Sequence, residues 1–360
     1  MKRFILVVLL LFLLAIVIVQ AAKEKIGRDL RQPIAETKLS PTPTIAIDPN
    51  QNIVTSVYVP YWALDDAENT TLYDQYIYFG ITPNRQGIAQ EEGFSRVNKF
   101  NELVPGGKAT YLALRMVDSE VNADILKDTK VQERIIAQTI AYAKKNNFDG
   151  IVLDLEMSAI PFDSLITQIN EFTKEIATAT KSQNLKFTMT LYGDTFYRVR
   201  PFDVNSLSQS TDSFMLMAYD FHKSRSNPGP NFPLKGNEKY GYDMTMLAQD
   251  ISIYTAPENV TVIFGMFGYD WEVDDKGKAT ASGVPLTYEQ IQAKFLNGCD
   301  FTDCQIERDT LSSETSISYI DENNQRHIVW FEDMESVNQK QEYLRTRGIS
   351  NFSFWAYSYF

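Results

Sequence analysis

Several residue types on which hydrolases commonly depend are scarce in this sequence. It has only two histidines, His222 and His327, although metal-dependent hydrolases usually need several imidazole ligands and a Ser-His-Asp enzyme needs a well-placed one. The sequence also lacks a G-x-S-x-G turn, a P-loop and a G-x-G-x-x-G segment. We therefore expect no metal and no cofactor, and we expect His222 to be a loop residue without a role. Any catalysis must depend on carboxylates.

Positive charge is also in deficit, with 34 Lys and Arg against 46 Asp and Glu and a net charge of −12. This balance argues against a nucleic-acid partner, whose phosphates would be repelled. It does not argue against a neutral substrate such as a glycan. Hydrophobic residues make up 44% of the 360 residues, so a large core can form. The length suits one barrel of roughly 250 residues with additional segments.

There are only two cysteines, Cys299 and Cys304, and they lie close together in the sequence. Outside the cell a disulfide between them is permitted. Two reduced and unrelated thiols are the alternative.

The N-terminus begins with two basic residues, Lys2 and Arg3, followed by an unbroken apolar run from Phe4 to Val19. Residues 1–22 are therefore either an uncleaved membrane anchor or a signal peptide cleaved near Ala21. The basic residues keep the N-terminus in the cytoplasm in both cases. We expect the rest of the chain to be extracytoplasmic, either secreted or in contact with the membrane through this segment alone.

Residues 23–52 are predicted to be a linker, since Ser40–Thr44 reads Ser-Pro-Thr-Pro-Thr and proline favours extended chain. Residues 53–360 are predicted to be one folded domain, in which strand-like and helix-like segments alternate. Such alternation is typical of a parallel sheet, and eight units predict closure into a (β/α)₈ TIM barrel. The predicted strands are Ile53–Pro60, Tyr76–Thr82, Ala109–Met116, Gly150–Glu156, Lys186–Leu191, Ser213–Tyr219, Val260–Phe267 and Asn351–Trp355.

Two segments between these strands have the apolar period of amphipathic helices. One runs from Val131 to Ala143, and Thr129 with Gln132 predicts a capping box at its start. The other runs from Leu165 to Ile176, and Pro161 suits its first turn.

Residues 270–334 interrupt the alternation and are too long for a loop. They contain a helix-like segment, Thr287–Asn297, and a hairpin-like pair within Thr315–Trp330 that turns at Glu322-Asn323-Asn324. We predict a small α+β insertion between the seventh strand and the seventh helix of the barrel, beside its mouth.

The fourth predicted strand carries two acidic residues, Asp154 and Glu156. Alternate residues of a strand share a face, so Val152 and both acids point one way and Leu153 and Leu155 point the other. The apolar set would pack on the surrounding helices. The acidic set would point into the barrel, with Glu156 at the carboxyl end of the strand, where barrel enzymes place their active sites. Two shielded carboxylates about 7 Å apart cannot ionise independently, which is how a glutamic acid becomes a general acid.

These residues resemble a motif of glycoside hydrolase family 18, the chitinase-like family. The motif D-x-x-D-x-D-x-E is matched at three of its four positions, with Asp149, Asp154 and Glu156 present and Val152 in place of the inner aspartate. Further matches follow in order along the chain. They are Met217-Ala218-Tyr219-Asp220 on the sixth strand, Phe264-Gly265 through Trp271 on the seventh, and Phe354-Trp355 on the eighth. The insertion and Val329–Asp333 resemble the branch of spore-cortex and cell-wall hydrolases.

The resemblance implies a site and a mechanism. Glu156 would protonate the glycosidic oxygen, while the substrate's own 2-acetamido group attacks the anomeric carbon. Asp154 would accept a hydrogen bond from the acetamido N–H, and the Tyr219 hydroxyl would hold the acetamido oxygen. Asp149 would have a structural role. Expected substrate contacts are Met217, Asp220, Trp355 and Tyr61, and candidates for sugar stacking or rim packing are Trp62, Tyr192, Tyr269 and Trp271.

We therefore expect a glycosidase that cleaves β-1,4 linkages next to N-acetylglucosamine, in peptidoglycan or a chitin-like polysaccharide. The alternative, motivated by Val152, is a weak or inactive glycan-binding protein of the same fold at the cell wall. The sequence does not fix the oligomeric state, and a monomer is expected.

Overall fold

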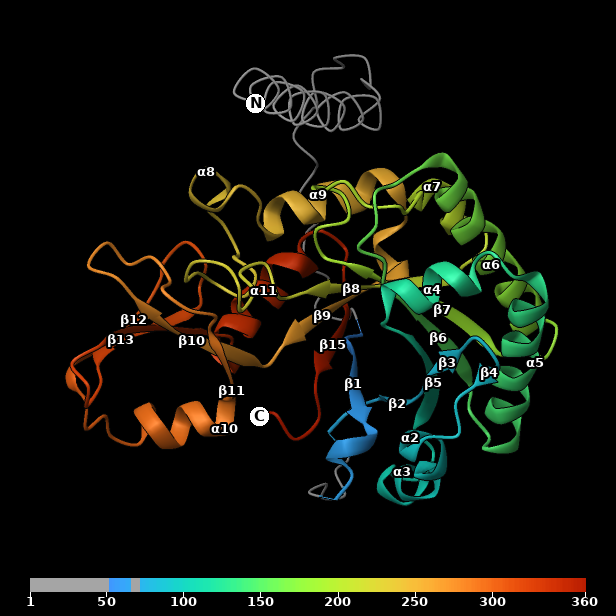
Figure 1. Cartoon of the computed structure of the whole chain (residues 1–360), viewed down its shortest axis with the longest axis horizontal. Helices are drawn as coiled ribbons and strands as arrows, with labels where there is room; N and C mark the ends of the chain where they lie inside the picture. The colour runs from blue at the N-terminus through green and yellow to red at the C-terminus, as the bar shows by residue number, and fades with distance from the viewer. Residues whose placement is uncertain (1–51, 66–71) are drawn as a thin grey trace, which may run out of the picture. The chain divides into compact units, whose positions relative to one another are not determined.

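The computed structural model describes residues 52–65 and 72–360. Among them eight parallel strands close into a barrel in the order β1-β15-β9-β8-β7-β6-β5-β2 (Figure 1). This confirms the predicted TIM barrel, and each predicted strand lies within two residues of the observed one. The barrel strands are β1 (Val54–Pro60), β2 (Gln75–Ile81), β5 (Ala109–Met116), β6 (Gly150–Leu155), β7 (Lys186–Tyr192), β8 (Ser213–Ala218), β9 (Val260–Gly265) and β15 (Asn351–Trp355).

The predicted membrane or signal segment, residues 1–22, lies outside the described residues, as do residues 23–51 of the predicted linker. Of the helices that the structure does describe, none has both the length and the apolar character needed to cross a membrane.

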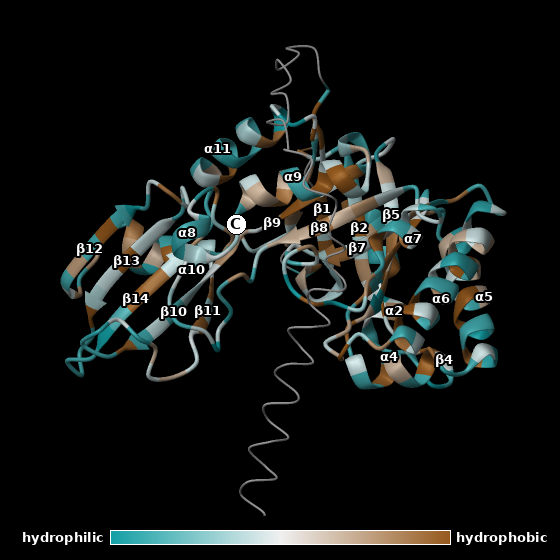
Figure 2. Cartoon of the chain, turned by 90° about the horizontal axis from the view of Figure 1, so that it is seen from above, coloured by the Kyte–Doolittle hydropathy of each residue, from teal (hydrophilic) through white to brown (hydrophobic). Residues whose placement is uncertain are grey.

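Helices surround the barrel, and the longest are α5 (Thr129–Lys145) and α6 (Asp163–Lys181). Both helices carry hydrophobic and hydrophilic residues in alternation along their length (Figure 2), as expected for helices with one buried face. The others are α2 (Glu92–Ser95), α3 (Val97–Leu103), α4 (Ser119–Ile125), α7 (Val204–Ser208), α8 (Asn237–Tyr240), α9 (Met244–Tyr254) and α11 (Met334–Arg345). Short elements are β3 (Pro83–Asn84), β4 (Gly87–Ile88) and the 3₁₀ turns Tyr61–Ala63 and Pro257–Asn259.

Two helix starts differ from prediction. Asp128, not Thr129, caps α5, because its carboxylate accepts from the backbone N–H groups of Lys130 and Val131. An ionised cap satisfies two free donors and complements the helix dipole, so it outcompetes the neighbouring threonine. In the second helix Phe162 is the N-cap, which leaves Pro161 before the helix instead of in its first turn.

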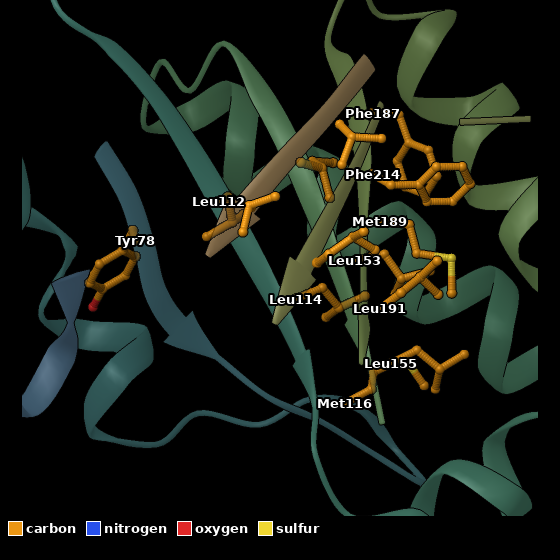
Figure 3. Close-up of a cluster of buried hydrophobic side chains, with 14 of the residues drawn as sticks. Tyr78, Leu112, Leu114, Met116, Leu153, Leu155, Phe187, Met189, Leu191 and Phe214 are labelled. Atoms are coloured by element: carbon orange, nitrogen blue, oxygen red, sulfur yellow. The ribbon is translucent and has the colours of Figure 1, made fainter. Parts of the chain in front are cut away.

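Each barrel strand buries both of its faces. The outward residues of β5, β6 and β7 pack beneath the helices, as Leu112, Leu153 and Met189 show (Figure 3). The inward residues form a separate cluster in the barrel interior, which includes Tyr58, Val152 and Met215. The predicted division of β6 into an inward acidic face and an outward apolar face is therefore confirmed.

Between β9 and α11 the chain forms a second sheet with the strand order β11-β10-β14-β13-β12, whose paired strands are antiparallel. It lies on one side of the barrel, away from α5 and α6 (Figure 1). This is the predicted α+β insertion. Its elements are β10 (Phe267–Val273), β11 (Val284–Thr287), α10 (Tyr288–Ile291), the π-helical turn Gln292–Leu296, β12 (Thr302–Arg308), β13 (Thr315–Ile320) and β14 (Arg326–Phe331).

Local features of the insertion follow its sequence. The hairpin between β13 and β14 turns as predicted, with Asn324 in the left-handed region at φ 61°. Thr287 caps α10 through a capping box with Gln290. Cys299 and Cys304 form a disulfide, so of the two alternatives for these thiols the structure contains the paired one.

A buried ionic cluster of Glu314, Glu332 and Lys340 ties the insertion to the barrel. All three side chains are fully buried. The Lys340 ammonium, on α11, donates to Glu314 at 2.7 Å and to Glu332 at 2.5 Å. Glu314 also accepts from the backbone N–H of Phe232 at 2.8 Å and from that of Asn231. The cluster is thus fully hydrogen-bonded, which is the condition under which buried charges persist.

Candidate active site

A cavity of about 570 Å³ opens at the carboxyl ends of the barrel strands. Its inner wall is formed by the ends of β6, β7 and β8, which contribute Asp154, Tyr192 and Met217. Its outer wall comes from the insertion, through Pro285–Thr287 and Gln290. Since the strand ends converge here and the second sheet stands beside them, the fold itself creates the cavity.

Asp154 and Glu156 both line this cavity, and they differ in exposure. Asp154 is 3% exposed, and its Oδ1 atom is a buried acceptor without a hydrogen-bond partner. Glu156 follows the last residue of β6 and is half-buried. An unpaired buried carboxylate oxygen is costly in a folded protein. Its presence at the cavity wall indicates that a bound molecule completes its hydrogen bonding.

The backbone of Glu156 is held from two directions. Its N–H donates to the carbonyl of Met116 at 2.8 Å, which continues the pairing of β6 with β5 beyond the strand. The buried amide of Asn122, on α4, donates to the carbonyls of both Met116 and Glu156, at 2.6 and 2.9 Å. The main chain that carries Glu156 is therefore fixed before any ligand binds.

Tyr192, at the end of β7, donates a hydrogen bond from its hydroxyl to Glu156 Oε2 at 3.1 Å. Arg200 lies over the Tyr192 ring at 4.0 Å and is itself held by two hydrogen bonds of 2.7 and 2.8 Å from Nη2 to Asp194. Tyr192, a candidate for sugar stacking from the sequence, thus contacts the expected acid directly.

Tyr219 and Asp220 follow β8, which is separated from β6 by β7 in the barrel, and both line the same cavity. Asp220 has a left-handed backbone, with φ 57°. The Asn231 side chain accepts from the Asp220 N–H at 2.7 Å and donates to the Gly265 carbonyl at 2.9 Å. The Asp220 carboxylate accepts from the Tyr269 hydroxyl at 2.8 Å. A Cβ on Gly265 would lie 2.6 Å from the Tyr219 side chain, so this glycine leaves room for Tyr219.

Burial dominates the electrostatics of the site. It raises the pKa of Asp154 well above its ordinary value, and the neighbouring Glu156 raises it further, while Arg115 lowers it. Burial also raises the pKa of Glu156, against the lowering effects of the Tyr192 hydrogen bond and the Lys223 charge. Two adjacent carboxyls with raised pKa values titrate as a coupled pair, so the proton that they share is retained to higher pH than on an isolated carboxyl. The pKa of Tyr219 is raised by burial and by Asp154, so its hydroxyl stays protonated and can donate.

Aromatic and apolar groups form the floor of the cavity. Trp355, at the end of β15, packs against Phe79 and Tyr58 with ring centroids 4.8 and 5.7 Å apart. Met217 is 8% exposed and lies in the same interior cluster. An apolar floor beneath polar walls suits a sugar ring, which has apolar faces and polar edges.

The structure brings together six of the seven predicted catalytic and substrate-binding residues. Glu156, Asp154, Tyr219, Met217, Asp220 and Trp355 line the cavity, as do Trp62, Tyr192 and Tyr269. Three further residues that the sequence analysis singled out do not line the cavity: Tyr61, Trp271 and Asp149.

The physical reason differs for each of the three. The Tyr61 ring turns toward Gly93 and the Arg115 guanidinium, while its neighbour Trp62 faces the cavity. Trp271 is fully buried in the insertion, and its indole N–H donates to the Ser224 carbonyl. Asp149 stands at the other end of β6, where its carboxylate accepts from the Thr110 N–H at 2.7 Å.

The two histidines lie outside the cavity lining. His222 Nδ1 is 2.7 Å from the Pro230 carbonyl oxygen, and His327 Nδ1 is 2.9 Å from Asp270 in the insertion. Within residues 52–65 and 72–360, no cluster of three or more His, Cys, Asp or Glu side chains is arranged to hold a metal ion.

Asn122, Asn231 and Arg115 support the site and were missed by sequence reasoning. None of the three lies on β6, and each supports a site residue that is at least eleven positions away in the chain. No local motif therefore marks them. The one available signal was Arg115, a charged residue inside an otherwise apolar strand.

An acid pair, a tyrosine and an aromatic floor at the carboxyl end of a closed barrel are the arrangement of a barrel glycosidase. The comparisons identify the family. A family model for glycosyl hydrolases family 18 matches residues 51–359. This chain belongs to that family, which confirms the resemblance seen in the sequence.

Individual relatives are distant. The cortical fragment-lytic enzyme of Bacillus anthracis is 23% identical over 77% of this chain and 63% of its own length. The endochitinase of Brugia malayi is 25% identical over 73% of this chain and 55% of its own length. The chain therefore spans less than two thirds of these two relatives.

Solved structures share the fold. The spore cortex-lytic enzyme SleL of Bacillus cereus superimposes with a TM-score of 0.68 at 19% identity, over 85% of this chain and 71% of that one. An N-acetylglucosaminidase of Paenibacillus barengoltzii gives a TM-score of 0.73 at 13% identity, over 86% and 96% of the two chains.

Proposed function

We propose that this protein hydrolyses β-1,4 glycosidic bonds next to N-acetylglucosamine, in peptidoglycan or a chitin-like glycan. The observation that carries the proposal is that Asp154, Glu156 and Tyr219 line one cavity. Membership of glycosyl hydrolases family 18 supports the same reaction class. So do the relatives described above, which include a cortical fragment-lytic enzyme and an endochitinase.

In the proposed mechanism Glu156 protonates the glycosidic oxygen as the bond to the anomeric carbon breaks. The substrate's acetamido carbonyl oxygen attacks that carbon from the opposite face and forms an oxazolinium ion, so no carboxylate nucleophile is required. Water then opens this ion with Glu156 acting as base, and the anomeric configuration is retained. The raised pKa of Glu156 supports its role as acid, because the carboxyl keeps its proton to higher pH than an ordinary glutamic acid.

Asp154 and Tyr219 act on the acetamido group. The unpaired Asp154 Oδ1 accepts from the acetamido N–H, which turns the carbonyl oxygen toward the anomeric carbon. The protonated Tyr219 hydroxyl donates to that oxygen. Asp154 must be ionised to stabilise the cationic intermediate, and substrate binding favours this by supplying a donor to the carboxylate.

A glycan-binding protein with little or no turnover is the second candidate, and Val152 is the observation that favours it. The family's inner aspartate is absent at this position, so the acid pair lacks its usual third carboxyl. This candidate predicts oligosaccharide binding without product.

The two candidates are separated by incubating the full chain with N-acetylglucosamine oligomers and with purified peptidoglycan, followed by product analysis. We expect cleavage by the wild type and by Glu133→Gln, a surface control on α5, and its loss in Glu156→Gln. Binding without products from the wild type would establish the second candidate. Product formation by Glu156→Gln at the wild-type rate would refute the assignment of Glu156 as the catalytic acid.

We also propose that the protein acts outside the cytoplasmic membrane, tethered there or secreted. Support comes from the apolar run Phe4–Val19 behind two basic residues and from the Cys299–Cys304 disulfide, a bond typical of oxidising compartments. Protease accessibility of the domain in intact cells tests this, and complete protection without lysis would refute it.

A further inference from the structure

Loss of the inner aspartate leaves Asp154 without a carboxyl partner below it. At this level the inward residues of β5, β6 and β7 are Ala113, Val152 and Thr188, which are in register with one another. Val152 packs in the interior cluster with Tyr58 and Met215. None of these groups carries a charge that could influence whether Asp154 is ionised.

One level higher, β5 places a cation beside Asp154. Arg115 and Asp154 are register partners on adjacent parallel strands. Leu114 and Met116 on β5 face the helices (Figure 3), and Ala113 belongs to the interior cluster. Alternation along the strand therefore turns Arg115 inward as well.

Arg115 and Asp154 carry opposite charges but share no hydrogen bond. Arg115 Nε is a buried donor and Asp154 Oδ1 is a buried acceptor, and neither has a hydrogen-bond partner. The attraction between the two side chains therefore acts through charge without a direct hydrogen bond, and Oδ1 stays available to a substrate. The guanidinium carbon lies 4.5 Å from the Phe79 ring centroid and 5.3 Å from that of Trp62. These rings hold the guanidinium plane, but they offer Nε no acceptor.

We propose that Arg115 is a positioning residue that partners the Asp154 carboxylate, in place of the motif aspartate that Val152 replaces. This inference rests on the proposed function, because the reaction needs Asp154 ionised while Glu156 carries the proton. A carboxyl partner achieves this by sharing the proton of Asp154, whereas a cation achieves it by direct attraction.

The other groups around Asp154 cannot supply this attraction. Tyr58 on β1, Tyr192 on β7 and Tyr219 just after β8 are neutral groups whose own pKa values Asp154 raises. Glu156 opposes ionisation of Asp154 by like charge, and Arg115 is the cation that favours it. Desolvation of the arginine, which lowers its pKa, is the cost of placing it there.

The test is a carboxyl-carbon NMR titration of the free full-length protein, with the Asp154 signal assigned from Asp154→Asn. Arg115→Met keeps the apolar stem and removes the charge, and should raise the pKa of Asp154 by about one unit. Arg115→Lys keeps the charge and should retain most of the wild-type value. Arg326→Met, a surface control in the insertion that is 60% exposed, should leave it unchanged.

Activity gives a second readout. The acidic limb of kcat/KM should move to higher pH in Arg115→Met by the same amount as the titration, because ionised Asp154 then exists only at higher pH. kcat should fall more than KM rises, and Arg115→Lys should restore much of the loss. A purely structural role for Arg115 would lower activity without moving the limb.

An unchanged Asp154 titration in folded Arg115→Met would overturn the inference. If that variant does not fold, Arg115→Gln keeps a planar polar group between the rings and gives the same measurement. The titration does not depend on turnover. A wild type without activity would therefore refute the proposed function, while the partnership of Arg115 and Asp154 would still be decided.

Discussion

Two groups of buried acids in this protein have opposite surroundings. Glu314 and Glu332 are fully buried, yet they are bonded to Lys340 and to backbone donors. At the cavity, Asp154 is almost as buried, but one of its oxygens has no partner. The first arrangement uses charge to fix one geometry, whereas the second leaves an acceptor available to a ligand. Burial of carboxylates alone therefore does not identify an active site, and the state of their hydrogen bonding does.

Removal of the expected acid gives the largest predicted effect. Glu156→Gln should reduce kcat by about 10²–10⁴-fold, the usual contribution of a general acid. The melting temperature should stay equal or rise, because a carboxyl of raised pKa is replaced by a neutral group. Product release from an oligomer and thermal denaturation measure the two quantities. Full activity of Glu156→Gln would contradict the view that the cavity acids are catalytic while Glu314 and Glu332 are structural.

The converse experiment removes the central charge of the structural cluster. Lys340→Met should lower the free energy of unfolding by about 3–5 kcal/mol, because the two buried carboxyl groups lose the cation between them. Denaturant unfolding measures the loss. Replacing all three residues by apolar ones of similar volume should cost less than this single change, since no unpaired charge remains. Equal stability of Lys340→Met and the wild type would show that the cluster does not hold the insertion.

A smaller effect is expected from the hydrogen bond to the acid. Tyr192→Phe removes the donor to Glu156 Oε2 and should reduce kcat roughly tenfold, the value of a hydrogen bond to a charged group. That bond lowers the pKa of Glu156, so its loss raises this pKa. The protonated acid then persists to higher pH, and the alkaline limb of the rate profile should move upward. A shift of the alkaline limb to lower pH would contradict the inference that the Tyr192 hydrogen bond lowers the pKa of Glu156.

The smallest effect concerns the pH dependence of stability. Burial raises the pKa of Glu332 to about 8, above the ordinary value of 4.5 that it regains on unfolding. The folded state therefore binds more protons between these values, and stability should fall as pH rises from about 4.5 to about 8 and then level off. Glu332→Gln should flatten this slope in thermal denaturation across that range. If stability depends on pH in Glu332→Gln as it does in the wild type, other titrating groups cause the dependence.

The architecture was predictable because its signals are local. All eight barrel strands are short runs whose residues face the interior on one side and the helices on the other, and the insertion interrupts the alternation visibly. The acid pair was found for the same reason, because Asp154 and Glu156 share one strand. Helix starts were less predictable, since Asp128 and Thr129 both suit a cap and only geometry decides between them.

Contacts between distant segments could not be predicted. Asn231 supports Asp220 from eleven residues away, and Asn122 on α4 supports Glu156, which follows β6. Tyr61 and Trp62 are adjacent in sequence, and the orientation of the turn decides which of them faces the cavity. Such outcomes depend on how loops from several strands meet, which a single sequence does not encode in any short pattern.

Part of the cavity wall belongs to β11 and α10 of the insertion, which contribute no group to the proposed chemistry. Residues such as Pro285, Leu286 and Gln290 can therefore change without disturbing the acids or the barrel that holds them. Selectivity for one glycan over another can thus evolve, or be engineered, independently of the catalytic step. Exchanging this short segment between relatives would be an economical route to enzymes with new preferences.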